Sequence, residues 1–168
     1  RSTALWTWFV SLCQSRALGT PRGDIEPVSG DASFRRYFRG VTEQGSWILV
    51  DAPVDREDSR PFLAVQVTLA AQGVQVPKVV AADLVKGFMC LQDFGSELLL
   101  GRLTTLQATG DEKNQGFSAA TDLYQQAFAE LLKIQQCDPL NPALPLFDRA
   151  MLLREMQLFT DWLCKGLL

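Results

Sequence analysis

A run of eleven residues, 29–39 (SGDASFRRYFR), combines small residues with arginines in a pattern suited to binding phosphate. A polyanion can approach the backbone closely where side chains are small, and successive N–H groups in such a turn can converge on it. The arginines that follow the turn supply fixed positive charge. The run therefore predicts a phosphate site made of Ser29, Gly30, Asp31, Ala32, Ser33, Arg35 and Arg36. The plainer alternative is an edge hairpin with a solvated basic rim.

Residues 34–39 follow the turn and predict a β-strand. Side chains alternate between the two faces of a strand. One face then carries Phe34, Arg36 and Phe38, and the other carries Arg35, Tyr37 and Arg39. We expect one of these aromatic and cationic faces to lie over a ligand and the other to pack on the domain.

No histidine occurs among the 168 residues. Mechanisms that depend on a histidine base, a histidine metal ligand or a Ser-His-Asp triad are therefore excluded from this chain. The net charge is −3, from 16 basic and 19 acidic side chains, which is not the charge pattern of a protein that binds nucleic acid or a membrane surface. A small anionic ligand fits this composition better than a polymer.

Cysteine usage and hydropathy predict a cytoplasmic protein. The four cysteines are far apart, have no C-x-x-C spacing and lie in apolar runs, so we expect reduced core thiols and neither a disulfide nor a metal site. The chain shows no signal-peptide pattern, and no apolar run reaches the length of a membrane span. Neither nucleic acid nor a membrane is therefore expected as a partner.

The order of the predicted elements indicates an α+β fold. Periodicity and capping residues predict helices at 2–17, 61–72, 98–106, 117–136 and 148–163, with Ser2 or Thr3 capping the first. Strands are predicted at 25–28, 34–39, 47–50, 77–84 and 87–92. A polar, mobile loop is expected at 107–116.

This order is similar to the small lobe of a protein-kinase-like phosphotransferase. The chain resembles the aminoglycoside phosphotransferase/choline kinase superfamily, and most of all its branch of bacterial kinases that phosphorylate N-acetylmuramate and N-acetylglucosamine at the anomeric hydroxyl. The motifs that carry the resemblance span nearly the whole chain: SGDASFRRYFR (29–39), DAP (51–53), ED (57–58) before RPF (60–62), VPK (76–78), AADL (81–84), QDFG (92–95), FD (147–148), LRE (153–155) and LF (158–159).

The resemblance implies a five-stranded antiparallel sheet plus a helix, followed by the first helices of an α-helical lobe. Residues 1–93 would form the nucleotide-binding lobe with its N-terminal helix, and residues 94–168 the hinge and the opening helices. It also implies ATP and Mg²⁺ as cofactors and a sugar as the partner of the nucleotide. The implied reaction is phosphoryl transfer to a hydroxyl of an N-acetylated amino sugar, in cell-wall recycling.

Two alternative functions stay open. One is an aminoglycoside- or choline-type small-molecule kinase, and the other is a nucleotide-binding or regulatory module without catalysis. The oligomeric state is open as well.

An adenine pocket at the turn after the fifth strand is a further implication of the resemblance. Residues 90–94 would form the hinge, where the backbone of Leu91 and Asp93 faces the adenine edge. Cys90 would stand at the back of the pocket. The purine would be covered by Phe34 and Val50. Without the resemblance, Val50 and Leu91 would be interpreted as core positions.

The chain departs from the family pattern on the third strand, which lacks the lysine that kinase-like lobes pair with a helix glutamate. The first lysine is Lys78, and residues 61–72 contain no acidic side chain. We therefore assign the role of that lysine to Arg35 or Arg36. Glu57 and Asp58 are expected to be solvated, although the family places them beside the phosphate loop.

The superfamily's catalytic base and metal ligands belong after residue 168, so no catalytic or metal-binding residue is assigned in this chain. Arg154 and Glu155, on the last predicted helix, are assigned to substrate contact, the alternative being a surface pair. Residues 1–168 alone are expected to bind nucleotide weakly and to transfer no phosphate.

Overall fold

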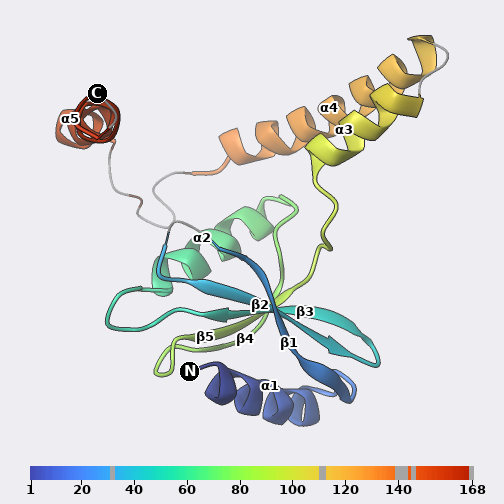
Figure 1. Ribbon diagram of the computed structural model, residues 1–168, viewed down its shortest axis with the longest axis vertical. Helices are drawn as coiled ribbons and strands as arrows, with labels where there is room; N and C mark the ends of the chain where they lie inside the picture. The colour runs from blue at the N-terminus through green and yellow to red at the C-terminus, as the bar shows by residue number, and fades with distance from the viewer. Residues whose placement is uncertain (31–32, 110–112, 139–143, 145–146, 167–168) are drawn as a thin grey trace. The chain divides into compact units, whose positions relative to one another are not determined.

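The computed structural model describes residues 1–30, 33–109, 113–138, 144 and 147–166 (Figure 1). They belong to two compact units, Arg1–Cys137 and Asp138–Leu168. The first unit contains the sheet and most of the helices, and the second contains the last helical segment. The predicted lobe boundary after residue 93 lies inside the first unit and stays a prediction.

An antiparallel sheet of five strands is the centre of the first unit. Its spatial order is β1-β2-β3-β5-β4 (Figure 1). The strands are β1 (Pro21–Gly30), β2 (Arg36–Thr42), β3 (Gly45–Asp51), β4 (Val79–Asp83) and β5 (Phe88–Gln92). The predicted five-stranded sheet and the α+β class are confirmed.

Strand boundaries differ from the prediction on both sides of the phosphate turn. β1 begins at Pro21, because its pairing with β2 extends to Thr42 through two register shifts. β2 begins at Arg36, so Phe34 and Arg35 lie in the connection rather than in the strand.

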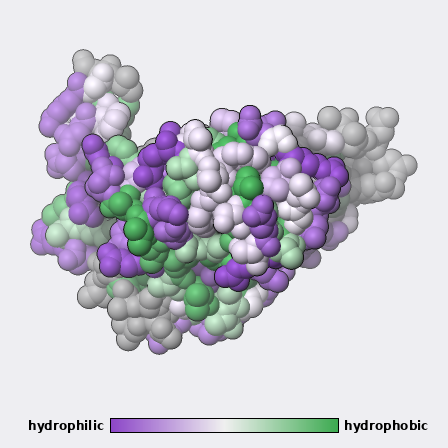
Figure 2. Space-filling view, turned by 90° about the horizontal axis from the view of Figure 1, so that it is seen from below, coloured by the Kyte–Doolittle hydropathy of each residue, from purple (hydrophilic) through white to green (hydrophobic). Residues whose placement is uncertain are grey.

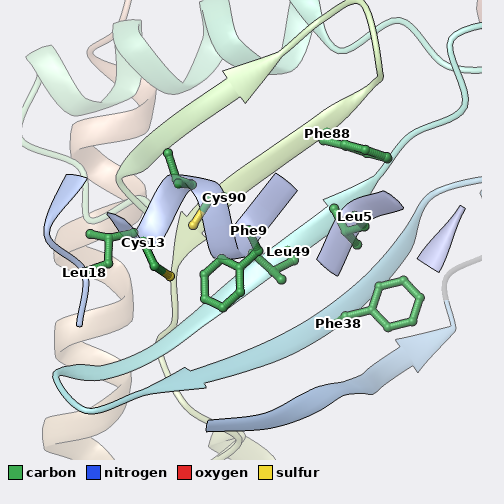
Figure 3. Packing of buried hydrophobic residues seen from close by; sticks show 9 residues of the cluster. Leu5, Phe9, Cys13, Leu18, Phe38, Leu49, Phe88 and Cys90 are labelled. Carbon is green, nitrogen blue, oxygen red and sulfur yellow. The ribbon is translucent and has the colours of Figure 1, made fainter. Parts of the chain in front are cut away.

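Helix α1 (Ser2–Arg16) packs on one face of the sheet (Figure 1). Its apolar side chains meet those of β2, β3 and β5 in the larger core cluster, which Figure 3 shows from close by: Leu5, Phe9, Leu12, Cys13, Leu18, Phe38, Leu49, Phe88 and Cys90. The predicted cap was wrong: Ser2 and Thr3 already lie inside the helix, and Arg1 is the N-cap without a side-chain capping bond.

Helix α2 (Arg60–Ala71) covers the opposite face of the sheet (Figure 1). Phe62 and Leu63 of this helix pack against a second buried cluster, made of Val50, Ala52, Met89 and Leu91. Period-two alternation along β3 and β5 sends neighbouring residues into different clusters. The sheet is therefore covered by a helix on each face.

Helix α3 ends later than predicted, and helix α4 begins earlier than predicted. The later helices are α3 (Leu99–Thr109), α4 (Lys113–Gln135), α5 (Arg149–Leu158) and a π-helical segment, Phe159–Cys164. The loop expected at 107–116 was wrong for its described residues, which are helical in α3 and α4; residues 110–112 lie outside the described residues. Asp148 caps α5, since its Oδ1 accepts the Met151 N–H at 2.8 Å.

Two charged side chains connect α4 to the turn that follows α2. Glu130 Oε2 accepts the Gln75 N–H at 3.0 Å, and Lys133 Nζ donates to the Gly73 carbonyl at 3.1 Å. Lys133 also pairs with Glu130 at 2.6 Å. These hydrogen bonds hold α4 against the segment that follows α2.

Cysteines occupy different environments. Cys13 and Cys90 are buried and Cys137 is half-buried, whereas Cys164 is exposed. The expectation of a core thiol was therefore wrong for Cys164, because residues 152–166 are all exposed. All four thiols are free.

The surface on the side of α1 mixes apolar with polar residues (Figure 2). Within the described parts of the chain, none of the helices combines the length and the apolar composition that a membrane span requires.

Candidate phosphate-binding site

The predicted phosphate turn connects β1 to β2. Ser29 and Gly30 end β1, and Gly30 is paired in register with Arg36 at the start of β2. Asp31 and Ala32 lie outside the described residues. Ser33 Oγ accepts the N–H of Arg35 at 3.2 Å, which fixes the turn where it enters the strand.

A carboxylate from a distant segment contacts the exit of this turn. Glu57 Oε1 accepts the Phe34 N–H at 3.1 Å. Glu57 Oε2 lies 3.2 Å from Arg35 Nε, in an ion pair that does not meet hydrogen-bond geometry. The Glu57 side chain is 16% exposed. The expectation that Glu57 is solvated was therefore wrong, whereas Asp58 is half exposed and pairs with Arg60.

Phe34 is exposed and lies under a cation. The Arg56 guanidinium carbon is 5.0 Å from the centre of the Phe34 ring, a distance typical of a cation–π contact. The segment that carries Arg56 and Glu57 thus contacts two consecutive residues of the turn, Phe34 and Arg35.

Arg36 is held on the other face of the sheet, where α1 packs. Its Nη2 binds Asp51 Oδ2, and Arg1 Nε donates to Asp51 Oδ1 at 2.7 Å. Arg1 Nη2 also donates to the Lys86 carbonyl at 2.8 Å. Arg35 and Arg36 line the same pocket, but they have different carboxylate partners: Arg35 pairs with Glu57 and Arg36 with Asp51.

Asp51 is fully buried in this cluster. Burial by itself would raise the pKa of the carboxyl, but the hydrogen bonds from Arg1 and Arg36 outweigh burial, and the pKa of Asp51 lies below its ordinary value. A charged aspartate between two arginines joins α1, β2 and β3.

The start of the predicted hinge is tied to β2 by a bidentate ion pair. Arg39 donates from Nε to Asp93 Oδ2 at 2.6 Å and from Nη2 to Oδ1 at 3.1 Å. Oδ1 also accepts the Gly95 N–H at 2.8 Å. The hydrogen bond from Arg39 lowers the pKa of Asp93 against the effect of burial. The side chain of Asp93 is thus structural, and its backbone role toward adenine stays a prediction.

Residues assigned to the adenine pocket divide between the two faces. Val50 and Leu91 lie in the cluster under α2, whereas Cys90 lies in the cluster under α1. Leu91 is paired on both sides, with Ile48 of β3 and Val79 of β4. Cys90 therefore shares no face with Val50, because neighbouring residues of β5 alternate.

Cys90 is fully buried, so its side chain is not accessible from a pocket. Burial raises the pKa of the Cys90 thiol to about 12, so this cysteine is a neutral core residue.

Arg154 and Glu155 lie on α5 in the second unit, and both are exposed. Their contact with substrate stays a prediction.

Three pairings were missing from the sequence interpretation: Arg35 with Glu57, Arg36 with Asp51, and Arg39 with Asp93. A signal existed for Asp51, because an acidic residue at the end of the apolar run Trp47–Val50 falls at an inward position and needs a cation to offset burial. No local pattern identifies Glu57, which lies in a charged connection.

The described residues fit the phosphates of a nucleotide better than they fit its metal. The described exit of the turn carries Arg35, and a guanidinium group suits phosphate oxygens. Among the described residues, no three His, Cys, Asp or Glu side chains are grouped closely enough to hold a metal ion.

Comparison with known proteins identifies the family of the chain. The phosphotransferase enzyme family matches residues 24–167. The chain is 42% identical over 142 residues to an N-acetylmuramate/N-acetylglucosamine kinase of Pseudomonas aeruginosa and 38% identical over 142 residues to a kinase of the same name from Pseudomonas putida. Both alignments cover 84% of this chain and 38% of the relative.

A third relative with that name, from Neisseria meningitidis serogroup B, is 36% identical over 140 residues, which are 83% of this chain and 39% of the relative. The chain thus spans less than half the length of these curated relatives. Since the family matches most of its residues, the chain belongs to the phosphotransferase enzyme family.

Proposed function

We propose that the protein carrying this chain transfers the γ-phosphoryl group of ATP to a hydroxyl of an N-acetylated hexosamine. The observation that carries the proposal is the β1–β2 turn with Arg35 fixed at its exit, in a chain whose curated relatives are named N-acetylmuramate/N-acetylglucosamine kinases. Residues 1–168 would supply the nucleotide-binding part of the site.

Arg35 and the backbone of the turn would hold the β- and γ-phosphates of ATP. Phosphoryl transfer requires positioning and neutralisation of charge, and both are provided by preorganised donors. Magnesium, when bound, would neutralise the phosphate oxygens, and its ligands are not assigned to the described residues. Arg36 is not assigned to the phosphates, because Asp51 holds it on the α1 face.

Substrate choice tests the proposal. The protein expressed from its complete reading frame would be given magnesium ATP with N-acetylmuramate, N-acetylglucosamine or kanamycin, and ADP release would be measured. We expect turnover with an N-acetylated hexosamine and little with kanamycin, because α5 and the π-helical segment carry a balanced set of charges rather than an acidic surface for a polycation. Faster turnover of kanamycin would reject the sugar assignment.

The same experiment separates a kinase from a module without catalysis. ATP binding without ADP release in the presence of any of these acceptors would favour the nucleotide-binding module.

A further inference from the structure

We propose that Glu57 is a positioning residue that holds Arg35 and the exit of the β1–β2 turn in the geometry that receives the nucleotide phosphates. This inference rests on the proposed function. Kinase-like lobes use a helix glutamate as the acidic partner of their phosphate-binding cation; α2 has no acidic residue, and Glu57 would take that role from a different position.

One carboxylate makes both contacts. Oε1 fixes the backbone through the Phe34 N–H at 3.1 Å, and Oε2 lies 3.2 Å from Arg35 Nε. The ion pair uses Nε rather than the outer nitrogens of the guanidinium, which are the pair suited to bidentate contacts with phosphate. Because the Glu57 and Arg35 side chains are only 16% and 23% exposed, solvent screens their attraction less than it screens a surface pair.

Glu57 is itself fixed by the end of β3. Its N–H donates to the Pro53 carbonyl at 2.8 Å, and the Arg56 N–H donates to the same carbonyl at 2.9 Å. The Ala52 N–H, one residue earlier, donates to the Gly87 carbonyl at 2.8 Å. The carboxylate is therefore placed by the sheet through a short turn, and not by a free loop.

A free arginine has many rotamers, and ordering it on phosphate costs conformational entropy. A partner that orders the side chain before the ligand arrives reduces this cost, which is the usual effect of preorganisation. Among the described residues, the other two cations near the turn have different partners: Arg36 binds Asp51, and Arg56 lies over the Phe34 ring.

The test compares Glu57→Gln, Arg35→Gln and the double variant in the protein with its complete reading frame. Binding of magnesium AMP-PNP and of AMP would be measured by calorimetry. Gln keeps the size of Glu and an oxygen for the Phe34 N–H, but it removes the charge that orders Arg35. Asp58→Asn is the matched control, because it removes a neighbouring charge that pairs with Arg60 and not with the turn.

We expect Glu57→Gln to weaken AMP-PNP about tenfold and AMP less than about twofold, since AMP lacks the β- and γ-phosphates. In the Arg35→Gln background the same change should have no further effect on AMP-PNP, and Asp58→Asn should bind both nucleotides like the parent. A merely structural role would weaken AMP and AMP-PNP equally.

Equal weakening of both nucleotides, additive losses in the double variant, or unchanged AMP-PNP binding would overturn the inference and leave the proposed function standing. A parent protein that binds neither nucleotide would overturn both. Thermal unfolding of each variant identifies loss of folding, and in that case Glu57→Asp, which keeps the charge but shortens the reach, replaces Glu57→Gln in the comparison.

Discussion

Asp51 determines which partner Arg36, a residue of the predicted phosphate site, binds in the folded protein. It is fully buried, and it accepts hydrogen bonds from Arg1 and Arg36. Without it, Arg36 would be a second cation free to serve the phosphate turn. With it, Arg36 becomes part of the connection between α1 and the sheet.

Replacing Asp51 with Asn should lower the free energy of unfolding at pH 7 by about 2 kcal/mol, because a buried charge-assisted pair is lost while the arginines remain partly solvated. The pKa of Asp51 is lowered in the folded state, so its contribution is complete above the ordinary aspartate value of 3.8 and is lost as the pH falls through the lower folded value. Urea unfolding should show the difference between parent and variant shrinking below about pH 4.

Asp55→Asn is the control for this experiment, since the Asp55 side chain is 75% exposed. A difference between parent and Asp51→Asn that stays constant down to pH 2 would contradict the assigned titration.

Replacing Arg35 and replacing Arg36 with alanine should have different effects on ATP binding and on stability. We expect Arg35→Ala to weaken ATP binding about tenfold with little change in stability, because its charge is proposed to bind the phosphates. Arg36→Ala should lower stability and change ATP binding by less than about twofold, because it leaves Asp51 buried with one partner. Calorimetry and urea unfolding measure the two effects, and equal loss of ATP affinity in both variants would refute the distinction.

At the scale of elements, the turn between β4 and β5 supports the end of β3. Gly87 has φ +70°, and an added Cβ would lie 1.9 Å from the Ala52 carbonyl oxygen. The Ala52 N–H donates to the Gly87 carbonyl, so the two backbones lie against each other at this point. Pro53, the residue after Ala52, begins the turn that ends at Glu57.

Gly87→Ala should therefore destabilise the protein by more than about 2 kcal/mol, through both the left-handed backbone and the clash. Gly73→Ala is a matched control, since Gly73 has φ +73° but open space around the added Cβ. We expect about 1 kcal/mol for the control in urea unfolding. Equal losses in the two variants would show that the Ala52 contact does not constrain the turn.

The whole molecule exposes large apolar side chains on its later helices. Phe128, Leu131 and Leu132 of α4 are 59%, 47% and 58% exposed, and their spacing puts them on neighbouring positions of one helix surface. In the second unit, Phe159 and Trp162 are exposed as well. Such surfaces favour association when nothing covers them.

Residues 1–168 expressed alone should therefore associate as the protein concentration rises. Light scattering after size exclusion would measure the mass, and Phe128→Glu with Leu132→Glu should shift it toward the monomer. A monomer at all concentrations would contradict this prediction.

The short chain should also release no ADP when given magnesium ATP and N-acetylmuramate. No catalytic base or metal ligand is assigned to these residues, and positioning of the acceptor hydroxyl and of the metal supplies most of the rate in phosphoryl transfer. Turnover comparable to that of the complete reading frame would mean that the base and the metal ligands lie within residues 1–168.

The sequence by itself determined the order and type of most elements, because these depend on local patterns. Periodicity of apolar residues and helix-capping signals identified α1, α2 and α4. Alternation along β2 placed Phe38 and Tyr37 on different faces, as the core clusters confirm. Gly87 was predicted inside the strand at 87–92, but it lies in the turn before β5. The loop predicted at 107–116 was wrong for residues 107–109 and 113–116, which are helical in α3 and α4, two helices that contact each other.

Only the tertiary structure decided which charged groups meet. Glu57 lies 22 residues from Arg35 along the chain, Asp51 lies 15 from Arg36 and Asp93 lies 54 from Arg39. An ion pair depends on distances of a few ångströms, which are set by strand order, register and the path of each connection. Those are properties of the folded sheet, and they paired Arg35 with Glu57 and Arg36 with Asp51.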